Sequence, residues 1–144
     1  MSVERKSSTP VLLTNLRVAQ AKGLIAAANV LKNEVKRNLR HGYLSSLGNW
    51  GDWVTGNNVN HVTASDPIFT SDGGSIKVGT DLDYALWWEI GHHNIFTRHY
   101  ERDPRWVPAY QTTRQQVLDT YARVFSATWR SVAPVGFYSE ATLD

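Results

Sequence analysis

Residues 76–110 read IKVGTDLDYALWWEIGHHNIFTRHYERDPRWVPAY, and the fold depends on how this stretch changes character along its length. Ile76 and Val78 alternate with polar residues, which predicts a half-buried strand. A turn follows, and residues 84–90 are then apolar on almost every side, which favours a short buried turn of helix or strand. A long polar loop comes next, and Pro108 suits the first turn of a helix. The stretch therefore predicts a strand, a short buried element and a helix joined by loops.

Glu89 is the one carboxylate among the apolar residues 84–90. A carboxylate is rarely buried without a partner, because it loses its hydration there. We therefore expect backbone N–H groups or a basic side chain to hold Glu89, and we expect its role to be structural.

Long amphipathic helices are predicted on both sides of this stretch. The first covers residues 16–39, with Thr14 or Asn15 as its cap, and its apolar residues recur at intervals of three and four in Leu24, Ala28, Leu31, Val35 and Leu39. The second runs from Pro108 to about residue 130, with similar spacing in Tyr110, Val117, Tyr121, Val124 and Thr128. The predicted core consists of Leu24, Leu31, Val35, Tyr121 and Val124 against the sheet face of Ile76 and Val78.

Between the first helix and residue 76, short apolar runs alternate with Gly and Asn, which predicts strands joined by turns. We expect strands at 50–55, 58–64 and 75–79, hairpin connections at 56–58 and 72–74, and a break at Asp66-Pro67. Because helix, strands and helix follow one another without alternating βα units, the predicted class is α+β. Its parts are a long N-terminal helix, a small antiparallel sheet of three or four strands, and a long C-terminal helix.

Length and composition set further bounds. The 144 residues predict one domain, with a flexible arm at 1–13, an α+β core at 14–130 and an extended tail at 131–144. The absence of cysteine excludes disulfides and thiolate zinc sites, and a formal charge of +2 is too small to indicate nucleic-acid binding by itself. No apolar run has the length of a membrane span or a signal peptide, so we expect no membrane association and no export by a signal.

A pattern of spaced residues crosses the central stretch: V-G-x-x-x-x-Y-A-x-x-x-E-x-G, then a polar loop, then an aromatic, Pro-containing start of the last helix. Its residues are Val78, Gly79, Tyr84, Ala85, Glu89, Gly91, Trp106, Pro108 and Ala109. This order resembles the small neck and tail-completion proteins of long-tailed bacteriophages and prophages. Upstream, Gly42, Leu44 and Ser46 are similar to a remnant of that family's Thr-Gly-x-Leu-x-x-Ser segment, with His41 in place of Thr.

The resemblance implies a structural virion protein of the phage neck, which forms a homo-oligomeric ring that joins head to tail or completes the tail around the DNA channel. Its partners would be copies of itself and other neck, connector and tail proteins. DNA would pass through the channel without sequence-specific binding. The implied location is the virion, after synthesis in the host cytoplasm. None of the matched residues is catalytic in the family, so we expect no enzymatic activity, no metal and no cofactor.

Surfaces for assembly are predicted where aromatic, apolar and cationic side chains lie in loops and in the tail, since Arg, Tyr and Trp are favoured at protein interfaces. Ile68 and Phe69 are expected to be exposed at the tip of a long connection between strands. The candidate interface residues are Ile68, Phe69, His92, His93, Phe96, Arg98, Tyr100, Arg102, Trp106, Phe137 and Tyr138.

A metal-dependent hydrolase is one alternative function. Glu89, His92, His93 and His99 are residue types that bind zinc and other divalent ions. They depart from the His-Glu-x-x-His helix of zinc proteases, because Gly91 interrupts the turn and no His stands before Glu89.

A small nucleic-acid-binding domain is the other alternative. Between residues 98 and 106, cations alternate with aromatic rings, which could follow a nucleic-acid backbone or stack on bases. Glu101 and Asp103 dilute this positive charge, so a protein interface is the favoured interpretation.

Overall fold

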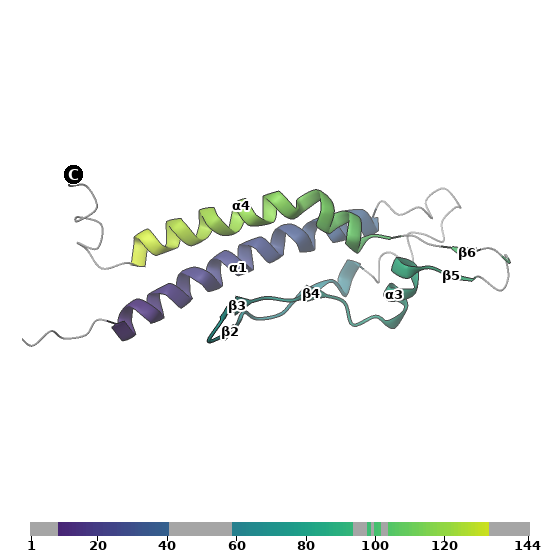
Figure 1. Ribbon diagram of the computed structural model, residues 1–144. Coiled ribbons are helices and arrows are strands. Elements are labelled where there is room, and N and C mark those ends of the chain that lie inside the picture. Colours follow the sequence, from purple (N-terminus) through teal and green to yellow (C-terminus); the bar gives the residue numbers. More distant parts are fainter. Residues whose placement is uncertain (1–8, 41–58, 94–97, 99, 102–103, 133–144) are drawn as a thin grey trace, which may run out of the picture.

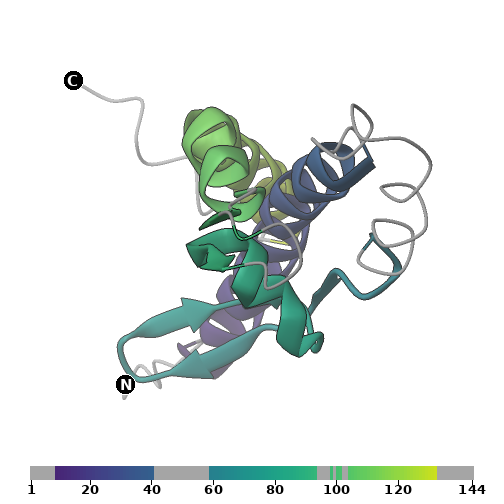
Figure 2. The same ribbon diagram turned by 90° about the vertical axis from the view of Figure 1, so that its right-hand side faces the viewer.

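The computed structural model describes residues 9–40, 59–93, 98, 100–101 and 104–132. Two long helices, α1 (Thr9–Arg40) and α4 (Trp106–Val132), run antiparallel along most of the molecule. A β ribbon lies along the side of α1 that faces away from α4 (Figures 1 and 2). The short helix α3 (Asp83–Ile90) lies near the end of the helix pair where α4 begins. The α+β prediction of long helices around a small antiparallel strand set is confirmed.

Amides on α1 hold both ends of α4. The side-chain Nδ2 of Asn15 donates to the carbonyl of Val132 at 2.8 Å, and Nδ2 of Asn38 donates to the carbonyl of Arg105 at 3.2 Å. Val132 is the last residue of α4, and Arg105 immediately precedes its first. Because the last carbonyls of a helix have no partner within the helix, the Asn15 bond satisfies an acceptor that would otherwise need water.

The two long helices approach each other closely at Gly23, which is buried in the middle of α1. A Cβ atom on Gly23 would lie 2.9 Å from Cδ2 and Cε2 of Tyr121 and 3.3 Å from the Tyr121 carbonyl oxygen. The Tyr121 ring itself stacks on Phe125, with centroids 5.8 Å apart and planes 17° from parallel. Gly23 therefore provides the space that the Tyr121 ring occupies, at the cost of lower helix propensity.

The four strands between residues 63 and 79 form one ribbon with a bulge. Strands β1 (Thr63–Ala64) and β4 (Val78–Gly79) pair antiparallel, as do β2 (Ile68–Thr70) and β3 (Gly73–Ser75). Between the two pairs, three residues on one arm, 65–67, face two on the other, 76–77, which is a bulge. The bulge places Pro67 where its missing N–H breaks no ladder bond, so the predicted break at Asp66-Pro67 is confirmed.

The hydrophobic core lies where the C-terminal half of α1 meets the start of α4. Its buried residues are Val35, Leu39, Val59, Val62 and Ala109, and Leu31, Val78 and Trp106 pack against them. The predicted core position of Val35 is confirmed, and Leu31 and Val78 lie at the core's edge. Toward the other end of α1, small residues such as Ala19 and Ala27 are buried instead, so the helices pack there with little side-chain volume.

Three sequence-based boundaries are wrong. Helix α1 already begins at Thr9, so residues 9–13 are not an arm, because Pro10 is tolerated in a first helical turn. Thr14 and Asn15 therefore do not cap α1; the Thr14 hydroxyl bonds the Pro10 carbonyl within the helix. The expected strand at 58–64 is helical at residues 59–60 and reduces to Thr63–Ala64, because Val59 and Val62 both face the core. The strand expected at 75–79 is interrupted: Ser75 is the last residue of β3, residues 76–77 lie in the bulge, and Val78–Gly79 form β4.

Other expected features are confirmed or lie outside the described residues. The hairpin expected at residues 72–74 joins β2 to β3, with Ser71 and Asp72 in the turn and residues 73–74 already paired in β3. The last helix has Pro108 in its first turn and ends at Val132. The strand expected at 50–55, the turn at 56–58, and residues 1–8 and 133–144 of the expected arm and tail lie outside the described residues.

Substituting Gly23 tests the close helix contact. We expect Gly23→Ala to lower the free energy of unfolding by about 1 kcal/mol or more, because the added Cβ overlaps the Tyr121 ring. Asn29→Ala, at an exposed position of the same helix, is the matched control and should raise stability by about 0.5 kcal/mol through helix propensity alone. Denaturant unfolding measures both, and equal stabilisation by the two variants would show that the contact is absent.

Candidate functional site

Helix α3 is an eight-residue segment, DYALWWEI, between two turns. Before it, the Thr80 hydroxyl accepts a hydrogen bond from the Leu82 N–H at 3.3 Å, which closes the turn after β4. After it, Gly91 adopts φ 92° and donates its N–H to the Trp87 carbonyl at 2.8 Å. Glycine enters this left-handed region without steric cost, so α3 ends where the sequence supplies Gly91.

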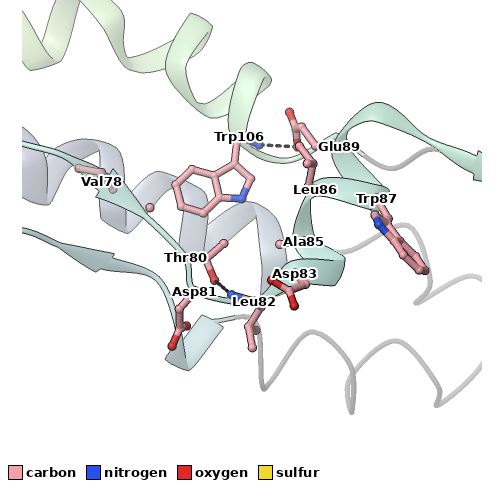
Figure 3. Close-up of a pocket in the computed structure, with 11 residues that line it drawn as sticks. Val78, Thr80, Asp81, Leu82, Asp83, Ala85, Leu86, Trp87, Glu89 and Trp106 are labelled. Atoms are coloured by element: carbon pink, nitrogen blue, oxygen red, sulfur yellow. Dashed lines mark hydrogen bonds between the residues drawn. The ribbon is translucent and has the colours of Figure 1, made fainter.

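The Glu89 carboxylate caps α4 from a different element. Oε2 of Glu89 accepts hydrogen bonds from the backbone N–H groups of Arg105 at 2.6 Å and Trp106 at 3.0 Å, and Oε1 accepts one from Val107 at 2.8 Å. Figure 3 shows this carboxylate meeting the start of α4. The expectation that backbone donors hold Glu89 is therefore confirmed.

These bonds complete the hydrogen bonding at the start of α4. The first N–H groups of a helix have no partner within it, and Glu89 takes those of residues 105, 106 and 107. Pro108 has no N–H, and the Ala109 N–H reaches the Arg105 carbonyl at 3.4 Å. Negative charge is also favoured at this end of the helix dipole. Glu89 therefore fixes the position of α3 relative to α4.

With Glu89 turned to α4, three other large side chains of α3 are exposed. Leu86 and Trp87 are each 60% exposed and Ile90 is 58% exposed. The sequence predicted a buried element at residues 84–90, and this prediction is wrong for Leu86, Trp87 and Ile90, because a helix that is apolar all round can cover only one of its sides in a chain of this size.

Trp106 separates two open grooves at this end of the molecule. The first, of about 740 Å³, lies between α3 and the Trp106 indole and includes Leu86 and Trp87 (Figure 3). The second, of about 660 Å³, lies along the start of α4 and includes Val107 and Tyr110. We call Leu86, Trp87, Trp106, Val107 and Tyr110 the Trp106 surface. All of them except Trp106, which is half-buried, belong to the exposed large apolar residues of the chain.

The first groove is acidic. Asp81, Asp83 and Glu89 line it, and none of its described lining residues is Lys or Arg. Asp81 also pairs with His61, whose ring Nδ1 lies 2.7 Å from the Asp81 carboxylate. This hydrogen bond lowers the pKa of Asp81, so the group keeps its negative charge over a wider range than an ordinary aspartate. The rim of the groove is therefore negative at neutral pH.

The side chains of Glu89 and His93 are the described part of the predicted metal site. Strand β5 (His92–His93) pairs with β6 (Tyr100–Glu101), and the His93 side chain is exposed. Glu89 is already bonded to three N–H groups, and His99 lies outside the described residues. Among the residues that are described, no three His, Asp or Glu side chains are placed to hold a metal ion.

The predicted interface residues have different surroundings. Trp106 is part of the Trp106 surface, and Ile68 is exposed on β2 as expected. Phe69 is half-buried, and its ring lies beside Gly74 near Leu24 of α1, so its predicted exposure is wrong; alternation along β2 turns it toward α1. Arg98 is exposed with φ 57°. Phe96, Arg102, Phe137 and Tyr138 lie outside the described residues, as do the side-chain environments of His92 and Tyr100.

Sequence patterns missed most of the Trp106 surface. Leu86 and Trp87 were assigned to a buried element, and Tyr110 to the buried side of the last helix. One sequence feature could have indicated this exposed surface: residues 84–90 are apolar on every side of the helix, and Glu89 stands among them. No helix in the described part of the chain is long and apolar enough to cross a membrane.

No protein-family model, no curated protein and no solved structure matches this chain. The similarity of residues 78–109 to phage neck proteins therefore stays a prediction.

Removing the charge of Glu89 tests its capping role. We expect Glu89→Gln to lower the free energy of unfolding by about 1.5–3 kcal/mol, because hydrogen bonds to a charged acceptor are lost at a helix start. Asp119→Asn is the matched control: Asp119 is exposed in the middle of α4 and bonds Gln115 at 2.9 Å. That variant should change stability by less than about 0.5 kcal/mol. Equal effects in thermal and denaturant unfolding would contradict the capping role.

Proposed function

We propose that this protein is a structural subunit of the bacteriophage neck, and that its copies assemble into a ring that joins head to tail or completes the tail around the DNA channel. The observation that supports this proposal is the Trp106 surface, where large apolar and aromatic side chains stand in solvent at one end of the molecule. Contiguous exposed apolar surface of this kind is typical of protein interfaces.

The use of the ionisable groups also favours assembly over catalysis. Glu89, the carboxylate nearest Trp106 in the first groove, has both oxygens committed to backbone N–H groups of α4. A catalytic acid or base needs to reach a substrate within hydrogen-bond distance, and a carboxylate held this way would have to release the start of a helix to do so. Glu89 is one of the residues on which the resemblance to phage neck proteins rests, and its role here is to stabilise the fold.

The architecture suits a subunit that contacts neighbours at both ends. The paired helices α1 and α4 make a long body, and α3 lies beyond the core at one end of it (Figure 1). Contacts between unlike surfaces of identical subunits repeat around an axis, and they close into a ring when the rotation permits. A ring is the form that leaves a central channel for DNA.

The two alternative functions make different demands. A metal-dependent hydrolase would require ligands other than Glu89, since this carboxylate is engaged with α4. A nucleic-acid-binding domain would require a positive surface, and α1 carries six cations, Arg17, Lys22, Lys32, Lys36, Arg37 and Arg40, against Glu34. No Lys or Arg lies among the described residues that line the acidic groove, so this groove does not suit DNA.

Particle assembly tests the proposed function. In cells that produce the phage, deletion of the gene should leave filled heads and tails unjoined in electron micrographs, and the wild-type gene should restore infectious particles. Joined, infectious particles without the protein would overturn the proposal.

A pair of exposed leucines then tests the role of the Trp106 surface. Leu86→Lys should fail to restore particles, because a charge replaces an apolar side chain within the groove. Leu118→Lys, at a similarly exposed leucine of α4 that lines neither groove, should restore them. Equal complementation by both variants would show that the Trp106 surface has no part in assembly.

A further inference from the structure

A second exposed apolar surface lies on the N-terminal half of α1. Val11, Val18 and Ile25 are 57%, 39% and 45% exposed, and they are spaced seven residues apart. Residues seven apart lie on the same side of a helix, two turns from one another. Lys22 is exposed between Val18 and Ile25 along the same side. We call Val11, Val18, Lys22 and Ile25 the outer stripe of α1.

The outer stripe and the Trp106 surface lie at opposite ends of the long body. The stripe occupies the part of α1 that adjoins the end of α4, as the bond from Asn15 to Val132 shows. The Trp106 surface lies where α4 begins, beside the C-terminal half of α1, as the bond from Asn38 to Arg105 shows. Figure 1 shows the two ends well apart. One molecule therefore cannot cover its own groove with its own stripe.

The two surfaces also carry opposite charge. The first groove is lined by Asp81, Asp83 and Glu89 and by no described Lys or Arg. The only acidic residue of α1 is Glu34, which pairs with Arg37 at 2.5 Å and lies in the other half of the helix. The stripe therefore presents apolar side chains with positive charge, Lys22 within it and Arg17 beside it. Complementary charge of this kind steers and orients association.

We propose that the groove between α3 and Trp106 of one copy receives the outer stripe of α1 from a second copy. Ile25 and Val18 enter the apolar groove beside Leu86 and Trp87, and Lys22 lies against the Asp81 and Asp83 rim. The partner is a second copy because the same chain carries both complementary surfaces. DNA does not fit the groove, since its phosphates would meet the carboxylates there.

This inference rests on the proposed function and deepens it, since it names the two surfaces that meet. Because the surfaces differ and lie at opposite ends, each copy offers one of each to its neighbours. The contact is therefore head-to-tail, and every added copy leaves one groove and one stripe open until a ring closes.

Mixing two defective variants tests the pairing. The groove variant Leu86→Lys and the stripe variant Ile25→Glu should each remain monomeric in sedimentation velocity at concentrations where the wild type forms larger species. When mixed, they should form a dimer and nothing larger, because the intact stripe of one enters the intact groove of the other and the two defective surfaces end the chain. Leu118→Lys is the control and should associate like the wild type.

Each other outcome has a distinct meaning. If either variant alone associates like the wild type, or if the mixture stays monomeric although both variants are folded by circular dichroism, the pairing of groove and stripe is wrong. Association of the stripe variant alone would point to a groove that contacts a groove, and a mixture that stays monomeric would point to a groove that contacts a different protein. A wild type that is monomeric at every concentration also overturns the inference. The proposed function is judged separately, by whether particles without the protein are joined.

Salt gives an independent readout. Raising the ionic strength should weaken wild-type association, because the attraction between Lys22 and the Asp81 and Asp83 rim is screened. Lys22→Gln should reduce this salt dependence while leaving the apolar part of the contact. Salt dependence that is unchanged in Lys22→Gln would contradict the assigned charge contact.

Discussion

The Glu89 carboxylate on the start of α4 is the interaction on which the rest of the structure depends. It supplies acceptors for the N–H groups of residues 105–107, and Pro108 removes the next donor, so the helix begins without an unsatisfied group. The same contact joins α3 to α4, two elements that are connected in sequence by the loop after Gly91. Asn38 holds the Arg105 carbonyl from α1, so three elements meet at this point.

The position of α3 determines what the protein exposes. Because one side of this short helix is used to bring Glu89 to α4, Leu86, Trp87 and Ile90 are left in solvent. The core beside it is small: among the described residues, Val35 and Val62 are the large side chains that are fully buried. Elsewhere the long helices pack through Gly23 and alanines. At this end Trp87 and Tyr110 therefore add to the surface, whereas Trp106 packs against the core, and the exposed rings are the physical basis of the proposed assembly.

The β ribbon shows how far local sequence can predict pairing. Asp72, Gly73 and Gly74 correctly indicated a hairpin, and Asp66-Pro67 correctly indicated an interruption. The interruption proved to be a bulge, where the Ser65 hydroxyl accepts the Lys77 N–H at 3.1 Å and the Ser65 N–H reaches the Lys77 carbonyl at 2.8 Å. The bulge sets which residues lie opposite one another in the ribbon. This register cannot be predicted from the sequence of either arm alone.

The sequence by itself determined the α+β class, both long helices, the turn glycines and the need for a partner at Glu89, because each follows from local periodicity, backbone preference or the cost of burying a charge. Only the tertiary structure decided that this partner is the start of α4, that Asn15 holds the far end of that helix, and that Leu86 and Trp87 are exposed. These outcomes depend on which elements meet in space. An apolar segment such as residues 84–90 predicts that a surface will be covered, and the packing of the whole chain decides whether its own core covers it or another molecule must.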